Sequence, residues 1–178
     1  MVPSSDPAIP DPTSPDGPGL AGDGTRPLLG APVRSDQATS GFAGRVVLDP
    51  TTLGAMVAHC LIAYPAEGCG LLVGLPGAEE VVRCVPTRNV AGSAVLYAVD
   101  PRDHLRADRE AEGEGLAIVG VFHSHTHTDP YPSPTDVAQA PDPTWHYVLV
   151  SLRHELASIR SYRIVDGRID EEEVVVPG

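Results

Sequence analysis

Three histidines fall within five positions of the segment FHSHTHTDPYPSPTDV, residues 122–137. His123 and His125 are two positions apart on a segment that reads as extended, and side chains alternate along a strand. Both imidazoles therefore point the same way and can bind one metal ion. Catalytic zinc takes three protein ligands and leaves its fourth position for water. The segment thus predicts a metal centre whose third ligand comes from elsewhere.

Asp136 is the best candidate for the third ligand. The loop THTDPYP follows the strand and ends at SPTD, where Ser133 reads as a helix N-cap and Pro134 as the first helical residue. Taken alone, this pattern is most simply a capping box, in which Asp136 only caps the helix. The two interpretations are compatible, because a helix N-terminus keeps a carboxylate ionised, as a metal ligand must be.

A hydrolytic metal site also needs a general base that takes a proton from water and passes it to the leaving group. Glu67 precedes the apolar run GCGLLVG and follows a helix-ending proline, so it is placed where a strand edge can face the metal. A lone glutamate beside a proline is ordinarily a solvated turn residue. Only its combination with the pattern H-x-H-x7-S-x2-D favours catalysis.

The other histidines fit the metal centre less well. His127 continues the alternation, but Pro130 and Pro132 break the strand, so we expect His127 in a loop near the substrate channel. A metallo-β-lactamase-like site would draw on distant histidines such as His146 and His154. His146, however, lies inside a predicted strand, and the chain is short for that two-layered fold.

The elements that must position these residues follow from periodicity and turn signals. Asp49 and Pro50 read as the start of a helix, and the apolar run that ends in the two histidines reads as a central strand covered on both faces. We expect helices at 50–65 and 101–113 and a short helix from 134. We expect strands at 46–48, 67–77, 79–89, 94–100, 115–125, 145–152, 157–167 and 171–176.

The chain divides into two parts by composition. Residues 1–43 are crowded with Pro, Gly, Ser and Asp, which predicts a disordered tail, because such a segment buries too little apolar surface to offset its ordering entropy. Residues 44–178 predict one α/β domain, with a mixed sheet flanked by helices.

Charge and cysteine content narrow the class of protein. The net charge of −12 argues against nucleic-acid and anionic-membrane partners, which require clustered Lys and Arg. No apolar run approaches the roughly 20 residues that span a bilayer, so we expect a cytoplasmic protein. Cys60, Cys69 and Cys84 lack CxxC spacing and are expected as reduced thiols, with Cys69 a buried core residue rather than a nucleophile.

Glu67 followed by His123, His125, Ser133 and Asp136 at these spacings resembles the full motif of the JAMM (MPN+) metalloprotease family. The likeness extends from about residue 44 to 176 and includes GLLVG, HYVLVS and SYRIVDG. It implies an α/β sandwich related to cytidine deaminases. The deaminase chemistry itself is excluded, because H-x-E with P-C-x-x-C is absent.

The resemblance also implies roles for the motif residues. His123, His125 and Asp136 would bind Zn2+, Glu67 would activate a water molecule, and Ser133 would donate a hydrogen bond to the oxyanion of the tetrahedral intermediate.

The compact chain is most similar to the prokaryotic branch that hydrolyses a sulfur-carrier-protein–cysteine adduct. This similarity implies cleavage after the C-terminal Gly-Gly of a ubiquitin-like partner in cysteine biosynthesis. Two alternatives remain open, namely a general isopeptidase resembling deubiquitinases and a non-catalytic MPN-type scaffold.

Overall fold

The computed structural model describes residues 43–178. The tail expected at 1–43 lies outside the described residues, apart from its last position, and stays a prediction. The helices are α1 (Pro50–Ala63), α2 (Pro101–Gly113) and α3 (Pro134–Gln139). The strands are β1 (Arg45–Leu48), β2 (Cys69–Gly74), β3 (Glu80–Thr87), β4 (Ala117–His125), β5 (His146–Ser151), β6 (Ser158–Val165) and β7 (Arg168–Val175). Within this range no helix is long and apolar enough to cross a membrane.

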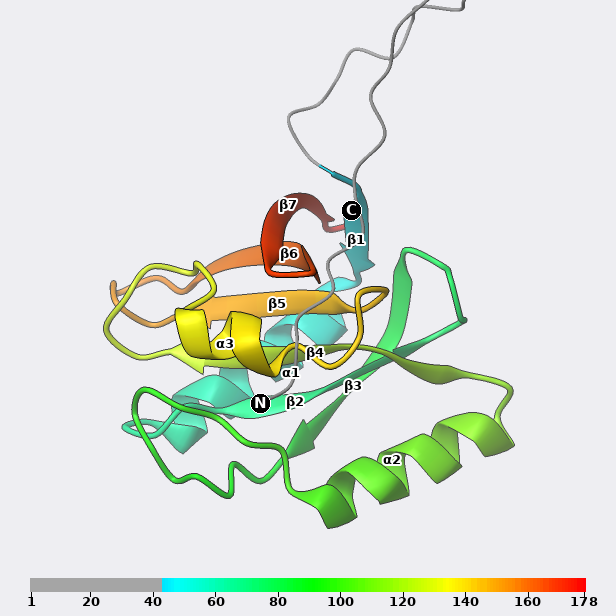
Figure 1. The fold of residues 1–178 in the computed structure, drawn as a ribbon, viewed down its shortest axis with the longest axis horizontal. Coiled ribbons are helices and arrows are strands. Elements are labelled where there is room, and N and C mark those ends of the chain that lie inside the picture. The colour runs from blue at the N-terminus through cyan, green and yellow to red at the C-terminus, as the bar shows by residue number, and fades with distance from the viewer. Residues whose placement is uncertain (1–42) are drawn as a thin grey trace, which may run out of the picture. The chain divides into compact units, whose positions relative to one another are not determined.

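The strands form one mixed sheet in the order β1-β3-β2-β4-β5-β6-β7, which closes on itself because β1 also pairs with β7. β4 pairs antiparallel with β2 and parallel with β5, while β1 is parallel to both of its neighbours. The α/β class with a mixed sheet, expected from the sequence, is confirmed. The closure was not predicted; Figure 1 shows β7 bending sharply toward β1.

All three helices begin with the same local device. Asp49, Asp100 and Ser133 are the N-caps, and each precedes a proline that starts the helix without an unsatisfied N–H. In α1, the Asp49 carboxylate accepts hydrogen bonds from the backbone N–H groups of Thr51 and Thr52, at 2.8 and 3.2 Å. The helix starts predicted from Pro50, Pro101 and Pro134 are therefore confirmed.

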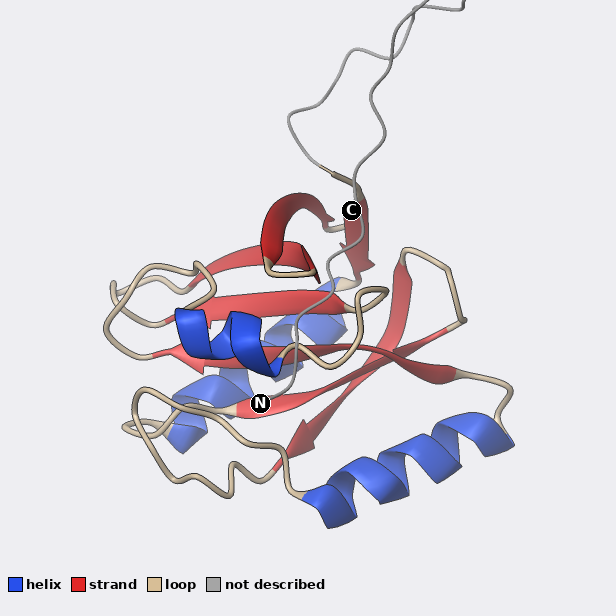
Figure 2. Cartoon of the chain, viewed as in Figure 1, coloured by secondary structure: helices blue, strands red, loops and turns tan. Residues whose placement is uncertain are grey.

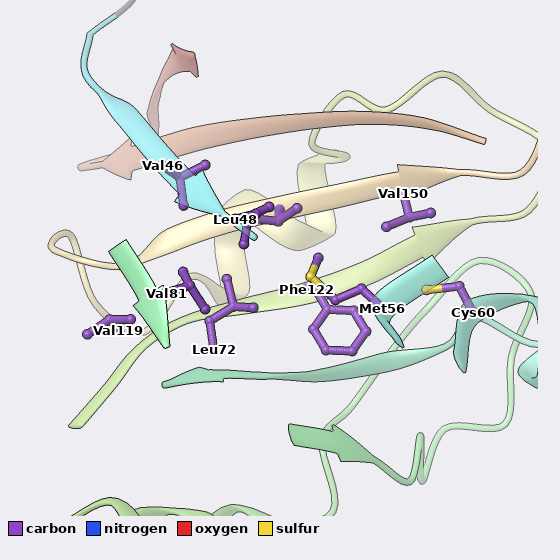
Figure 3. Packing of buried hydrophobic residues seen from close by; sticks show 10 residues of the cluster. Val46, Leu48, Met56, Cys60, Leu72, Val81, Val119, Phe122 and Val150 are labelled. Carbon is purple, nitrogen blue, oxygen red and sulfur yellow. The ribbon is translucent and has the colours of Figure 1, made fainter. Parts of the chain in front are cut away.

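Two apolar layers cover the central strands on opposite faces. One layer includes Met56 and Cys60 of α1 together with Phe122 of β4, as Figure 3 shows. Val121, the neighbour of Phe122, belongs instead to a cluster with Tyr147 on the opposite face. In Figure 2, α1 lies on one side of the sheet, and α2 and α3 lie on the other. β4 is therefore covered on both faces, as its continuous apolar sequence predicts.

The strand predicted at 94–100 is wrong. This segment forms only an isolated bridge between Asn89 and Val99. Part of its backbone is bound by one side chain, because the Asn89 amide oxygen accepts from Ala98 N and the amide nitrogen donates to Leu96 O. A side chain that satisfies the backbone locally competes with a strand ladder, so the apolar pattern of AVLYAVD misled the prediction.

A buried polar network joins the last three strands. Glu172 of β7 is 2% exposed and accepts hydrogen bonds from His146 Nδ1 at 2.9 Å, Ser161 Oγ at 2.9 Å and Arg163 Nε at 2.6 Å. Burial alone raises the pKa of this carboxyl, but its hydrogen bond with His146 and the nearby guanidinium outweigh burial and lower the pKa. The network accounts for the buried His146, whose ring bonds to Glu172 within the sheet and does not belong to the predicted metal site.

We expect Glu172→Ala to lower the free energy of unfolding by about 3 kcal/mol, because it leaves the buried His146 ring and the half-buried Arg163 guanidinium without their acceptor. Urea denaturation at pH 7 measures this loss. The contribution of an acid with a depressed pKa is present above the ordinary glutamate value of about 4.3 and disappears as the pH falls below it. The difference between wild type and Glu172→Ala should therefore shrink on acidification, and a constant difference would contradict this assignment.

Candidate metal centre

His123, His125 and Asp136 come together at the end of β4 and the start of α3. His123 Nε2 lies 3.2 Å from His125 Nε2 and 3.4 Å from Asp136 Oδ1, and His125 Nε2 lies 3.5 Å from Asp136 Oδ2. All three residues are buried. The strand alternation predicted for the two histidines holds, because Ser124 between them points away and its Oγ accepts a hydrogen bond from Gly68 N at 2.9 Å.

These separations fit a tetrahedral metal ion. Bonds of about 2.0–2.1 Å to nitrogen and oxygen give a tetrahedron with edges of about 3.3–3.4 Å. The two imidazole nitrogens lie 3.2 Å apart, and they lie 3.4 and 3.5 Å from different oxygens of the Asp136 carboxylate, which is close to that length. Two imidazoles and one carboxylate also form a donor set used by catalytic zinc sites with an open fourth position. The residues present therefore fit a metal ion held by three protein ligands.

Neighbouring groups orient both rings. His125 Nδ1 lies 2.9 Å from the Asp129 carbonyl oxygen, which only accepts, so Nδ1 carries the proton and Nε2 faces the other ligands. His123 is held by a different contact. The Tyr97 ring stacks on it with centroids 4.1 Å apart, and His123 Nδ1 has no hydrogen-bond partner within residues 43–178.

The electrostatics of the three groups favour metal binding. Burial lowers the pKa of His123, so its ring is neutral and offers a lone pair. Burial opposes ionisation of Asp136, but hydrogen bonds with His123 and His125 hold its pKa below the ordinary value. Burial also lowers the pKa of His125, but the Asp136 carboxylate and the Asp129 carbonyl outweigh that effect and raise it. A metal ion therefore competes with a proton at His125.

The capping box predicted at SPTD is present as well. Ser133 N donates to Asp136 Oδ2 at 2.7 Å, and Asp136 N donates to Ser133 Oγ at 3.2 Å. The capping interpretation of Asp136 is confirmed. The same carboxylate also faces the two imidazoles, so its predicted role as a metal ligand is compatible with the cap and stays a prediction.

Glu67 is 4% exposed and lies between α1 and β2. A Cβ on the next residue, Gly68, would come within 2.8 Å of the Cys60 backbone, so the glycine lets this segment pack directly on α1. Glu67, Ser133, His125 and Asp136 line one cleft of about 150 Å³. Burial raises the pKa of Glu67 to about 7, against the lowering effect of His125. A carboxyl with that pKa suits proton transfer near neutral pH.

The other residues considered in the sequence analysis lie outside the His123–His125–Asp136 group. His127 is exposed and also lines the cleft, as expected for a loop residue near the channel. His154 is exposed on the loop after β5. Cys69 is fully buried, and burial raises the pKa of its thiol, which fits a core residue. All three cysteines are free.

Sequence reasoning missed three residues that support the site. Tyr97 stacks on His123, the Asp129 carbonyl binds His125, and Asn89 donates to the Glu67 carbonyl oxygen at 2.9 Å. Asn89 is of a type that satisfies backbone groups in turns, which is the one available signal. Asp129 acts through its backbone carbonyl, so its residue type gives no signal. Tyr97 lay in the segment wrongly predicted as a strand.

Comparisons with known proteins agree with this geometry. Residues 50–165, which include every group of the cleft named above, match the family described as prokaryotic homologs of the JAB domain. Over 135 residues the chain is 43% identical to proteins of Mycobacterium bovis and Mycobacterium tuberculosis named "CysO-cysteine peptidase", covering 74% of this chain and 90% of each relative.

Two solution structures are also similar. A protein from Desulfitobacterium hafniense is 32% identical, with a TM-score of 0.68 and coverage of 74% of this chain and 92% of that one. A protein from Salinibacter ruber is 30% identical, with a TM-score of 0.58 and coverage of 74% and 91%.

We expect a divalent metal to stabilise the wild-type protein but not Asp136→Asn. At a free metal concentration one hundred times the Kd, binding to the folded state alone adds about 2.7 kcal/mol to the free energy of unfolding. Asparagine keeps a side-chain oxygen that can accept from Ser133 N, so the cap survives while the ionised ligand is lost. Denaturation with Zn2+ and with a chelator measures both effects. Equal stabilisation of the two proteins would contradict the ligand assignment.

Proposed function

Because the chain belongs to the family of prokaryotic homologues of the JAB domain, we propose that it is a zinc-dependent peptidase that releases cysteine from a ubiquitin-like sulfur-carrier protein. The family and the hydrolase class expected from the sequence are confirmed. The observation that carries the proposal is the His123–His125–Asp136 triangle, with a buried glutamate of raised pKa in the same cleft.

Different residues of the chain would bind the metal, transfer the proton and stabilise the oxyanion during hydrolysis. His123, His125 and Asp136 would hold Zn2+, which supplies a Lewis acid when bound. Glu67 takes a proton from the attacking water and returns it to the amine of the leaving group. The Ser133 hydroxyl accepts from Asp136 N, which leaves its own proton free to be donated to the developing oxyanion.

The size of the cleft supports a small leaving group. Its volume of about 150 Å³ is well below the roughly 300–1,000 Å³ of pockets that hold drug-sized ligands. A space of this size favours a slender tail without side chains and a small leaving group over a bulky one. We therefore propose a carrier with a C-terminal Gly-Gly, joined through an amide to cysteine. The 43% identical relatives named "CysO-cysteine peptidase" favour the same substrate class. A cytoplasmic location stays a prediction.

We expect Glu67→Gln to lower the hydrolysis rate by at least about a hundredfold while metal content is unchanged, because it removes the proton acceptor and leaves all three ligands. Glu114→Gln, an equivalent change at an exposed surface pair with Arg83, serves as the control. Elemental analysis and turnover of a carrier–cysteine adduct measure the two properties. Full activity in Glu67→Gln, or absence of bound metal from the wild type, would refute the catalytic account and favour the scaffold alternative.

The wild-type rate should also depend on pH through Glu67. Only the carboxylate accepts a proton, so the rate falls as the pH decreases through the pKa of this group. That pKa is about 7 in the metal-free site, and a nearby cation lowers it further. The acid limb of kcat/KM should have its midpoint at or below about 7. A rate that rises on acidification would contradict Glu67 as the base.

Substrate preference separates the two enzymatic candidates. We expect kcat/KM for a carrier–cysteine adduct to exceed that for a ubiquitin-like isopeptide by at least about tenfold, because the cleft holds a small leaving group. Parallel assays with one carrier, joined either to cysteine or to a lysine side chain of a second protein, measure the ratio. Faster cleavage of the isopeptide would favour the deubiquitinase-like alternative.

A further inference from the structure

The loop between β3 and α2 borders the cleft of the candidate site and does not form a strand. Its two ends are tied together, because Val90 N donates to Ala98 O at 2.9 Å and Asp100 N donates to Arg88 O at 3.0 Å. We call residues 89–98 the Asn89 loop, after the residue on which it is organised. The loop supplies Ala94 and Val95 to the wall of the cleft.

Asn89 is the only asparagine in the sequence. Its amide oxygen accepts from Ala91 N and Ala98 N, both at 3.0 Å. Its amide nitrogen donates to Leu96 O at 3.1 Å and to Glu67 O at 2.9 Å. The side chain therefore uses two donors and two acceptor positions, which is the full capacity of a primary amide. Among the four contacts, only the one to Glu67 leaves the loop.

The same loop holds both backbone polar groups of Glu67. The Glu67 N–H donates to Ser93 O at 2.8 Å, and the Glu67 carbonyl accepts from Asn89. Glu67 precedes the first residue of β2 by two positions, so these bonds to the loop take the place of a strand ladder. The loop thus fixes the backbone from which the Glu67 carboxylate extends.

Two further contacts connect the loop to the ligand strand. Thr126 Oγ1 donates to Ala94 O at 3.0 Å, directly after His125, and the Tyr97 ring stacks on His123. One ten-residue loop therefore contacts the segment that carries the base and the segment that carries two ligands. It therefore adds a second connection between two segments that the β2–β4 ladder already pairs.

We propose that Asn89 is a positioning residue for hydrolysis, which holds the Glu67 carboxylate at its working position beside the His123–His125–Asp136 group. This inference rests on the proposed function, in which Glu67 is the base. An error of about 1 Å in the placement of a reacting group can cost about a hundredfold in rate. Asn89 therefore acts through Glu67 and makes no contact with substrate.

Asn89→Asp is the sharpest variant. It has the same shape and keeps the oxygen that accepts from Ala91 N and Ala98 N, so the loop retains those two bonds. It replaces the donor to Glu67 and Leu96 with a carboxylate oxygen, which repels both carbonyls. We expect kcat for the carrier–cysteine adduct to fall by at least about tenfold, with KM and metal content within about twofold of wild type.

The double variant Glu67→Gln, Asn89→Asp tests whether Asn89 acts through the base. If it does, Asn89→Asp produces no further loss in the residual single-turnover rate of Glu67→Gln. An equal loss in both backgrounds, or a rise in KM with unchanged kcat, would overturn the proposal. Hydrolysis that survives Glu67→Gln alone would instead refute the proposed function, so the two failures are distinguishable.

A measurement on the wild-type protein tests the same hydrogen bonds without requiring that any variant folds. Because the chain contains one asparagine, labelling with [15N]asparagine gives one side-chain amide nitrogen, with one pair of proton signals, in the NMR spectrum. Two hydrogen-bonded protons predict exchange with water at least about tenfold slower than in free asparagine. Exchange at the free rate would show that the bonds to Glu67 and Leu96 are absent in solution and would overturn the proposal.

Discussion

The site depends on one carboxylate that serves two structural purposes. Asp136 Oδ2 accepts a hydrogen bond from the backbone N–H of Ser133, the N-cap of α3. Both carboxylate oxygens also face the imidazoles of β4. A buried anion is tolerated only when it is paired and hydrogen-bonded. The start of a short helix and the end of a central strand are therefore held in contact by the same charge. His123, His125 and Asp136 come together because both requirements are met by this one carboxylate.

The sheet places the second carboxylate relative to the first. Cys69 pairs with His123 in the ladder between β2 and β4, and Glu67 lies two positions before Cys69. His123 also pairs with Leu149 in the parallel ladder to β5. Two ladders thus fix β4, which carries the two histidines. The ladder between β2 and β4 also fixes how far along β4 the residue Glu67 lies. The remaining freedom at Glu67 is removed by the loop that binds its backbone N–H and carbonyl.

The two carboxylates of the cleft have opposite electrostatic environments. Imidazoles and the N-terminus of α3 surround Asp136, and its pKa is lowered; Glu67 is dominated by burial, which raises its pKa to about 7. A pair of acids whose pKa values are pushed apart divides naturally into a permanent anion and a group that exchanges protons. The first property suits a metal ligand, and the second suits a general base.

The sequence by itself predicted the three residues that the structure brings together, the caps and most of the elements, because these follow from local rules. Alternation placed His123 and His125 on one face, and the pairs Asp49-Pro50, Asp100-Pro101 and Ser133-Pro134 marked the three helix starts. Only the tertiary structure decided the closure of the sheet through β1 and β7, the conformation of residues 94–100 and the part played by Asn89. The closure and the bond from Asn89 to Glu67 join residues far apart in the chain, and the conformation of residues 94–100 depends on a single side chain. Neither leaves a periodic pattern in the sequence.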